Sequence, residues 1–361
     1  MATPWSMYSC MPAAQSGRVY RVSGFRPTRP PPGRLVRLGV VLDTRNEPSR
    51  LREVATMCDR VGVDAVWVRD PGASADDHPR LEAWMALTLA GLATSRARIG
   101  AMLDIALRPA ATLAAMAGTL DLILGGRLEI GFTGGPEREQ RTLGGEAPER
   151  TTLAGRLEEY ARIVRALLAG ESIGARGPSS EARDARLGIA SLQPAGPRVS
   201  IEVTGSAGIR VAARIADDVV IPGMAVPDLP AVIEQVRTGC EAAERDPSSL
   251  GIAVELPVSI GRTSVEADAR ASAEPLFGTI GHPARVGIFG TLEQCQDRVV
   301  EMAHAGVTEL RCIVPNTADV HDVIAQLTAM VVGTVGVLSP NAPRSRAPDP
   351  PEGWGGRSSR H

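Results

Sequence analysis

The sequence predicts an α/β protein that folds as a closed (β/α)8 TIM barrel with insertions after its fourth and seventh strands. Short runs rich in Val, Ile and Leu alternate with stretches of helical apolar periodicity, and eight such runs can be counted. No G-x-G-x-x-G fingerprint follows the first run, which argues against an open dinucleotide-binding sheet. We expect one barrel domain in residues 34–335, between disordered tails rich in Pro, Gly, Ser and Arg at residues 1–33 and 336–361.

The expected strands are nearly continuous in aliphatic residues rather than alternating with polar ones. This pattern is typical of parallel strands that are covered on both faces. In chain order the strands are residues 36–42, 65–69, 98–104, 128–132, 199–204, 219–222, 252–260 and 309–314.

The stretches between these runs carry helix signals. Apolar stripes at helical spacing run from Leu51 to Val61 and from Leu153 to Leu168. Thr291 and Gln294 form a capping box, and the helix that they begin is expected to end at Gly306. Two connections, residues 133–198 and 261–307, are too long for simple turns and predict lids or substrate walls.

Composition excludes several classes of function. The net charge of −2 provides no basic surface for nucleic acid, and no apolar stretch is long enough for a membrane span or a signal peptide. All 39 cationic residues are arginine, which excludes chemistry that needs a lysine amine, such as pyridoxal-phosphate or Schiff-base catalysis. The 5 cysteines and 5 histidines lack metal-ligand spacing, so we expect reduced, mostly buried thiols, no metal site and a cytoplasmic protein.

In a barrel of this class the active face lies at the carboxyl ends of the strands. The turn after the fifth strand, Thr204-Gly205-Ser206-Ala207, precedes a helix directly and offers backbone N–H groups and hydroxyls to a phosphate. A tight turn that needs glycine for its dihedral angles explains the same residues. After the fourth strand, Thr133-Gly134-Gly135 leaves a surface without large side chains that a flat ring could approach, although a plain loop explains it nearly as well.

Two carboxylates follow neighbouring strands of the expected barrel. Asp70 ends the second strand and Asp104 the third, so both should point toward the mouth, where burial could raise a pKa enough for proton transfer. A structural salt bridge to arginine is the alternative for each. A serine hydrolase is disfavoured because Ser206 lies in T-G-S-A-G rather than G-x-S-x-G.

Several segments resemble the bacterial luciferase-like superfamily. They are Gly62-Val-Asp-Ala-Val-Trp-Val-Arg-Asp70, the stretch from Leu81 to Gly100, Thr119-Leu-Asp-Leu-Ile-Leu-Gly-Gly-Arg127 with the following strand, Arg210 to Asp218, and Gly290-Thr-Leu-Glu-Gln294 to Gly306. The resemblance spans roughly residues 35–332 and occurs in the family's order. It implies a TIM barrel with a flavin-type ring across the strand ends.

The resemblance also implies residue roles. Asp70 corresponds to the acidic residue near the ring, and Thr133, Gly134 and Gly135 correspond to backbone contacts. Met102 and Leu103 correspond to a bulge of the third strand that often carries a cis peptide. The phosphate clamp corresponds to Thr204, Gly205, Ser206 and Ala207, and Pro222 and Gly223 at the end of the sixth strand join the cofactor surface.

One departure affects the proton donor. Several deazaflavin-dependent members have Asp-His after the second strand, whereas this chain has Asp70-Pro71. Asp70, Asp104, the substrate or water could then supply the proton. A trans, unbulged third strand at Leu103 would count against the deazaflavin assignment.

The leading hypothesis is an oxidoreductase that uses the deazaflavin coenzyme F420 to move a hydride to or from a C=C or C=N bond of a small organic or natural-product substrate. The alternatives are an FMN-dependent monooxygenase fed by a separate flavin reductase, and a flavin-binding barrel without catalysis. Fold alone does not choose among them. The resemblance also implies a homodimer.

Overall fold

The computed structural model describes residues 34–70, 80–134, 153–173, 185–189, 191–223, 226–275, 277, 282–316 and 320–332. Eight parallel strands pair in a closed circle, in the order β1-β2-β3-β4-β5-β6-β7-β9 and back to β1. These strands are β1 (Arg37–Val41), β2 (Ala65–Arg69), β3 (Arg98–Asp104), β4 (Leu128–Thr133), β5 (Arg198–Glu202), β6 (Asp218–Pro222), β7 (Gly251–Ile260) and β9 (Glu309–Ile313).

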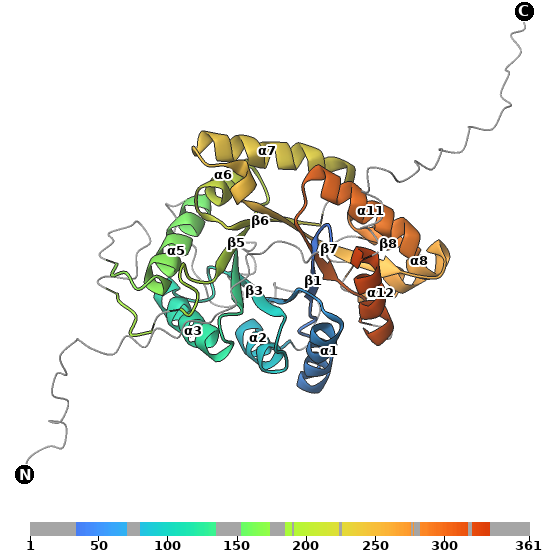
Figure 1. Cartoon of the computed structure of the whole chain (residues 1–361), viewed down its shortest axis with the longest axis horizontal. Helices are drawn as coiled ribbons and strands as arrows, with labels where there is room; N and C mark the ends of the chain where they lie inside the picture. Colours follow the sequence, from blue (N-terminus) through green and yellow to red (C-terminus); the bar gives the residue numbers. More distant parts are fainter. Residues whose placement is uncertain are drawn as a thin grey trace, which may run out of the picture.

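Helices surround this circle of strands (Figure 1). They are α1 (Pro48–Val61), α2 (Ala83–Leu92), α3 (Ala110–Ile123), α5 (Leu153–Leu168), α6 (Ser206–Ile215), α7 (Leu229–Ala242), α8 (Ser264–Ser272), α10 (Pro283–Val286), α11 (Leu292–Ala305) and α12 (Val320–Val332). The predicted TIM barrel is therefore confirmed. Both predicted tails, residues 1–33 and 336–361, lie outside the described residues.

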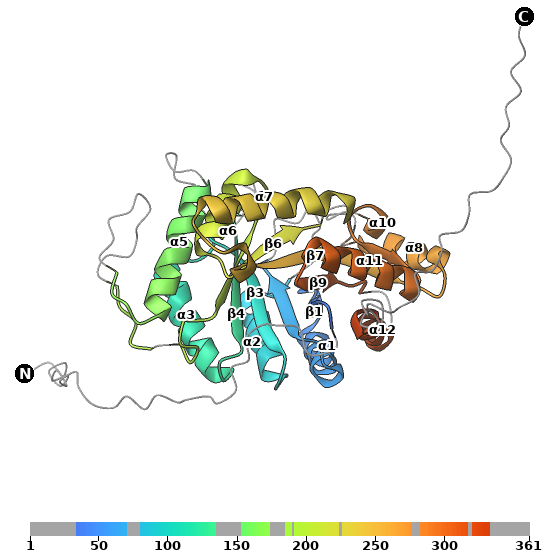
Figure 2. The same cartoon turned by 45° about the horizontal axis from the view of Figure 1, so that its top comes forward.

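The predicted strand ends agree with the observed ones to within two residues. One strand was not predicted: β8 (Ile288–Gly290), which pairs with the end of β7 inside the second insertion. At three residues it is too short to show a periodicity of its own. In Figure 2, α8 and α10 lie together at one side of the barrel beyond β7, and Figure 1 shows β8 next to α8.

Local signals explain where the helices begin and end. The Thr291 hydroxyl accepts from the backbone of Gln294, whose side chain accepts from the Thr291 backbone, so the predicted capping box begins α11. Gly306 ends α11 with a left-handed φ of 111°, and Gly62 ends α1 with a φ of 84°. Both stops deliver the chain directly into the next strand.

The main core lies between the sheet and the helices, where the outward-facing Val, Ile and Leu side chains of the strands are buried. The four cysteines in the described part of the chain are free and buried, as predicted; Cys10 lies outside it. Among the described helices, none combines the length and the apolar character that crossing a bilayer requires.

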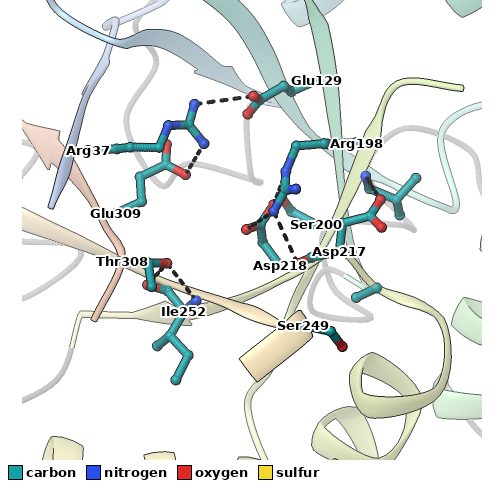
Figure 3. Close-up of polar contacts among 12 residues, drawn as sticks. Arg37, Glu129, Arg198, Ser200, Asp217, Asp218, Ser249, Ile252, Thr308 and Glu309 are labelled. Atoms are coloured by element: carbon teal, nitrogen blue, oxygen red, sulfur yellow. Dashed lines mark hydrogen bonds and ion pairs between the residues drawn. The ribbon is translucent and has the colours of Figure 1, made fainter. Parts of the chain in front are cut away.

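The barrel interior is ionic at the end where the strands begin. Arg37 donates to Glu129 at 3.2 Å and to Glu309 at 3.4 Å, and Arg198 donates to both oxygens of Asp218 (Figure 3). Arg98 also donates to Glu129. We call this set, with Arg311, the floor network. It consists of Arg37, Arg98, Glu129, Arg198, Asp218, Glu309 and Arg311.

Trp67 fills the interior above the floor network. Its indole N–H donates to Glu309 at 3.0 Å, and the Arg311 guanidinium stacks 3.4 Å from its ring centre. The ring lies where a Cβ on Gly100 would sit, so a side chain at position 100 would collide with it. A glycine on β3 therefore makes room for this one large side chain of β2.

Candidate active site

Four polar side chains meet where the barrel strands end. Arg69 is the last residue of β2, Thr133 of β4 and Glu202 of β5, while Glu255 lies in the middle of the longer β7. Arg69 donates to Glu255 at 2.5 Å and to Glu202 at 2.6 Å, and the Thr133 hydroxyl donates to Glu202 at 2.9 Å. We call these four residues the mouth cluster. The Arg69 side chain is 30% exposed, so the cluster reaches solvent.

The two glutamates of the mouth cluster are bonded unequally. Glu202 accepts on both carboxylate oxygens, from Arg69 and from Thr133. Glu255 accepts from Arg69 on Oε1, whereas its buried Oε2 has no hydrogen-bond partner among the described residues. Burial and the neighbouring Glu202 raise the pKa of the Glu255 carboxyl, against the lowering effect of Arg69. The cluster therefore favours a proton on Glu255.

Asp70 lies at the predicted mouth but is held in an ion pair. Both of its carboxylate oxygens accept from Arg108, at 2.7 and 2.8 Å, and one also accepts the backbone N–H of Asp104 at 2.9 Å. Arg108 binds Glu82 as well. The structure thus has the salt bridge that was the alternative for Asp70, and this carboxylate orders the β2 and β3 ends rather than standing free.

Asp104 is buried at the end of β3, beside Asp70. One of its oxygens accepts the backbone N–H of Ala106 at 2.8 Å. Burial raises the pKa of the Asp104 carboxyl, and the nearby Asp70 carboxylate adds to the effect. Asp104 is therefore a candidate proton carrier of the mouth, with no bonded arginine among the described residues.

The predicted third-strand contact differs from the structure. All peptide bonds of the described residues are trans, and β3 pairs with β2 and β4 in regular register through Leu103. The expectation of a cis peptide and a bulge there was wrong, and this regular third strand counts against the deazaflavin assignment. Met102 is buried inside the barrel, 3.3 Å from Arg311, and Leu103 is buried in the outer core. Neither side chain is therefore exposed at the mouth, and the Met102 carbonyl accepts the backbone N–H of Asp70 at 2.9 Å.

The glycine surface after β4 is partly filled. The Leu153 side chain, from the first residue of α5, occupies the place where a Cβ on Gly134 would sit. Glycine at position 134 thus lets α5 pack closely against the end of β4. Thr133 belongs to the mouth cluster, and Gly135 lies outside the described residues.

The turn after β5 is open. Thr204, Gly205, Ser206 and Ala207 are exposed, and α6 begins at Ser206 without a side-chain cap. No described atom lies within 4 Å of where a Cβ on Gly205 would sit. The first backbone N–H groups of α6 therefore face free space, as an anion-binding helix end requires. Pro222 and Gly223, at the end of β6, are half-buried.

The second insertion covers another side of the mouth. Glu274 accepts from Arg45 at 2.9 Å and from the backbone N–H of Asn316 at 2.6 Å, so the segments that follow β1 and β9 are tied to it. Phe277 is fully buried in the same apolar cluster as Ile313 of β9. This part of the insertion forms a wall, as its length predicted.

Sequence reasoning did not identify Arg69, Glu202 and Glu255. The available signal was a charged residue inside each of three otherwise apolar strands. That signal does not show that the three residues meet, because their convergence depends on the register of β2, β5 and β7 across the barrel.

A family model described as luciferase-like monooxygenase matches residues 33–287. An F420-dependent glucose-6-phosphate dehydrogenase of Amycolatopsis mediterranei is 28% identical over 225 residues. That match covers 60% of this chain and 66% of the relative, so the chain spans just under two thirds of the relative's length.

Solved structures share the fold. An F420-dependent secondary alcohol dehydrogenase, in complex with an F420-acetone adduct, superposes with a TM-score of 0.73 at 18% identity, covering 83% of this chain and 99% of that one. A long-chain alkane monooxygenase superposes with a TM-score of 0.69 at 13% identity, covering 84% and 91%. Both likenesses concern the barrel.

Proposed function

The chain belongs to the luciferase-like monooxygenase family, and we propose that it is an oxidoreductase that depends on the deazaflavin coenzyme F420. In this proposal it moves a hydride to or from a C=C or C=N bond of a small organic or natural-product substrate. The relatives with F420-dependent names favour this branch of the family.

One observation carries the proposal: an open, uncapped helix N-terminus stands at the end of β5, beside the mouth cluster. Thr204 and Ser206 offer hydroxyls there, and Gly205 leaves the approach unobstructed. These donors fit the phosphate group of a flavin-type cofactor. The strand ends would then hold the ring between the phosphate site and the mouth cluster.

When bound, the deazaflavin would supply or accept the hydride. The chain's own residues would position and shield the reaction. The Asp70–Arg108 pair fixes the ends of β2 and β3, and the Glu274 and Phe277 wall excludes water from the β1 and β9 side. Asp104 and Glu255, whose carboxyl pKa values are raised by burial, provide acidic groups for proton transfer.

Equilibrium titration with F420 and with FMN, followed by cofactor fluorescence, tests this assignment. We expect tight binding of F420, weakened about tenfold by Ser206→Asp, because the added carboxylate repels the phosphate at the start of α6. Ser264→Asp at the start of α8 is the matched control and should leave the dissociation constant unchanged. F420 binding that is insensitive to Ser206→Asp would remove the phosphate site.

The same titration separates the other hypotheses. Preferential binding of reduced FMN, with a peroxyflavin absorbance in the presence of oxygen, would indicate a monooxygenase supplied by a separate flavin reductase. Tight F420 binding with no turnover on alkene and imine panels would indicate a binding protein without catalysis.

We also propose a homodimer formed through α2 and α3. The sequence of α2 contains no charged residue, yet Met85 and Leu92 are each 66% exposed, and Leu122 and Ile123 of α3 are exposed as well. Soluble monomers seldom leave such a surface uncovered. Sedimentation analysis should give a dimer for the full chain and a monomer for Met85→Asp/Leu92→Asp. Val265→Asp, at an exposed apolar residue of α8, should leave the dimer intact.

A further inference from the structure

The Glu255 carboxyl has an incomplete set of partners. Its Oε1 accepts from Arg69, while its Oε2 is buried without a hydrogen-bond partner among the described residues, and the side chain as a whole is only 4% exposed. A buried carboxylate oxygen without a donor is costly. The missing partner is therefore a proton on this oxygen, or a donor brought by a ligand.

The charges that face Glu255 decide where the negative charge of the mouth cluster lies. Arg69 of β2 is its bonded cation, Glu202 of β5 shares that cation, and Arg311 of β9 acts from below. On β6, the residue opposite Glu255 is the uncharged Pro222. Glu255 therefore shares its bonded cation with a second carboxylate, and burial together with Glu202 raises the pKa of its carboxyl.

Carboxylates share a cation elsewhere at the mouth as well. Arg108 is shared between Asp70 and Glu82, and Asp104 lies beside them without a bonded cation of its own among the described residues. With a proton on Glu255, the mouth cluster holds one cation and one anion and offers no net positive charge to a phosphorylated or carboxylated substrate. A basic nitrogen would instead find both a proton and a counter-charge there.

We propose that the substrate carries a C=N bond and that the Glu255 carboxyl binds and protonates its nitrogen. This inference rests on the proposed function and narrows its substrate class. The O–H bond of Glu255 breaks, the substrate N–H bond forms, and the resulting iminium carbon accepts the hydride from the reduced deazaflavin. The substrate is reduced to an amine, the cofactor is oxidised, and Arg69 balances the glutamate charge until a solvent proton returns.

The other acids of the mouth fit this role less well. Both oxygens of Asp70 are held by Arg108. Asp104 is the competing candidate for the proton donor, since it is buried and its carboxylate accepts the backbone N–H of Ala106 rather than an arginine N–H. The experiment must therefore separate Glu255 from Asp104.

The first measurement uses the full chain without cofactor. Infrared spectra across the pH range should show a protonated-carboxyl band that persists above the pH at which an ordinary glutamate ionises, and one component of it should disappear in Glu255→Gln. Glu129→Gln is the matched control, because Glu129 is as deeply buried but surrounded by arginines. An unchanged band in Glu255→Gln would overturn the proton assignment. Circular dichroism melting establishes that each variant is folded.

The second measurement compares cyclic imines of increasing size with cyclic enones of matched shape, using reduced F420. We expect kcat/KM to favour the imines at least tenfold. Glu255→Gln should lower the imine value by about 100-fold and abolish the loss of rate at high pH, as expected when a general acid is removed. A comparable enone preference, or an alkaline limb that survives in Glu255→Gln but not in Asp104→Asn, would overturn the proposal.

The two measurements distinguish a failure of this inference from a failure of the proposed function. If the wild-type chain binds no F420, the proposed function fails, whereas the infrared spectra of the cofactor-free protein still decide whether Glu255 holds the proton. If F420 binds and enones react while imines do not, the proposed function stands and this inference fails.

Discussion

The two ends of the barrel interior treat a buried glutamate in opposite ways. In the floor network the pKa of Glu129 is lowered to about 2, because Arg37, Arg98, Arg198 and Arg311 outweigh the effect of burial. In the mouth cluster, burial and Glu202 raise the pKa of Glu255 against a single bonded arginine. Each glutamate has one buried oxygen without a partner among the described residues. Because both glutamates share this feature, the surrounding charges separate them: four arginines lower the pKa of Glu129, whereas Glu255 shares Arg69 with Glu202.

Removing one cation from the floor network should destabilise the folded protein. Arg37→Met removes one of the two arginines paired with Glu309 and one of the two paired with Glu129 in the interior, so the free energy of unfolding should fall by about 3–5 kcal/mol. Urea denaturation measures the loss. Arg50→Met, which breaks an exposed pair with Glu53, is the control and should change stability by less than about 0.5 kcal/mol. Similar losses for the two variants would mean that the floor network does not stabilise the barrel.

Glu129 in the floor network and Glu255 in the mouth cluster should make the free energy of unfolding change with pH in opposite directions. Glu129 has a lowered pKa in the folded state, so its contribution, on the order of 3 kcal/mol, is present above pH 4.5 and is lost as the pH falls toward 2. Glu255 has a raised pKa, so its contribution is present below pH 4.5 and is lost as the pH rises toward the folded-state value.

Denaturation at a series of pH values tests these slopes. Glu129→Gln should flatten the acid side of the profile, and Glu255→Gln should flatten the decline above pH 4.5. If Glu129→Gln instead flattened the decline above pH 4.5 and Glu255→Gln flattened the acid side, the assignment of the two slopes would be wrong.

Removing one carboxylate from the mouth cluster should bring its ratio of cations to carboxylates closer to that of the floor network. In Glu202→Gln, Arg69 has only Glu255 as a charged partner, so the pKa of Glu255 should fall by roughly one unit or more. The pH at which the infrared carboxyl band disappears reports this shift. Thr133→Val removes a donor to Glu202 and should move the band in the opposite direction, because Glu202 then competes better for the proton. An unmoved band in both variants would show that the cluster does not share a proton.

The smallest effect should come from a change that touches neither end directly. Thr291→Ala removes the capping box of α11, the helix that leads to β9, and should lower the free energy of unfolding by about 1 kcal/mol. Thermal melting measures this loss. Because no ionisable group changes, the pH windows of Glu129 and Glu255 should stay where they are. A shifted window would indicate that the position of β9 controls the interior charges.

The fold could be predicted more completely than the site. Strands and helices follow from local periodicity and capping, as the observed ends of α1 and α11 illustrate, and a barrel requires only that successive strands pair. The strand β8 could not be predicted, because three residues carry no periodicity and depend on pairing with the long β7.

The site depends on distances across the barrel, which periodicity does not encode. Asp70 and Asp104 were placed correctly at the mouth, but the bidentate contact of Arg108 with Asp70 joins residues 38 positions apart. Arg69, Glu202 and Glu255 converge only through the closed register. The open turn at Thr204–Ala207 was predictable because its glycine and the helix that follows are local.

The close fit of Trp67 against Gly100 has a consequence for how this chain can diverge. A side chain cannot be gained at position 100 while the indole remains, and losing the indole alone would leave a void and strand the Arg311 guanidinium. Neither step is tolerable by itself, so the two positions should change together among descendants of this sequence. In an alignment of such descendants, replacements at positions 67 and 100 should occur together, and neither position should vary while the other is unchanged.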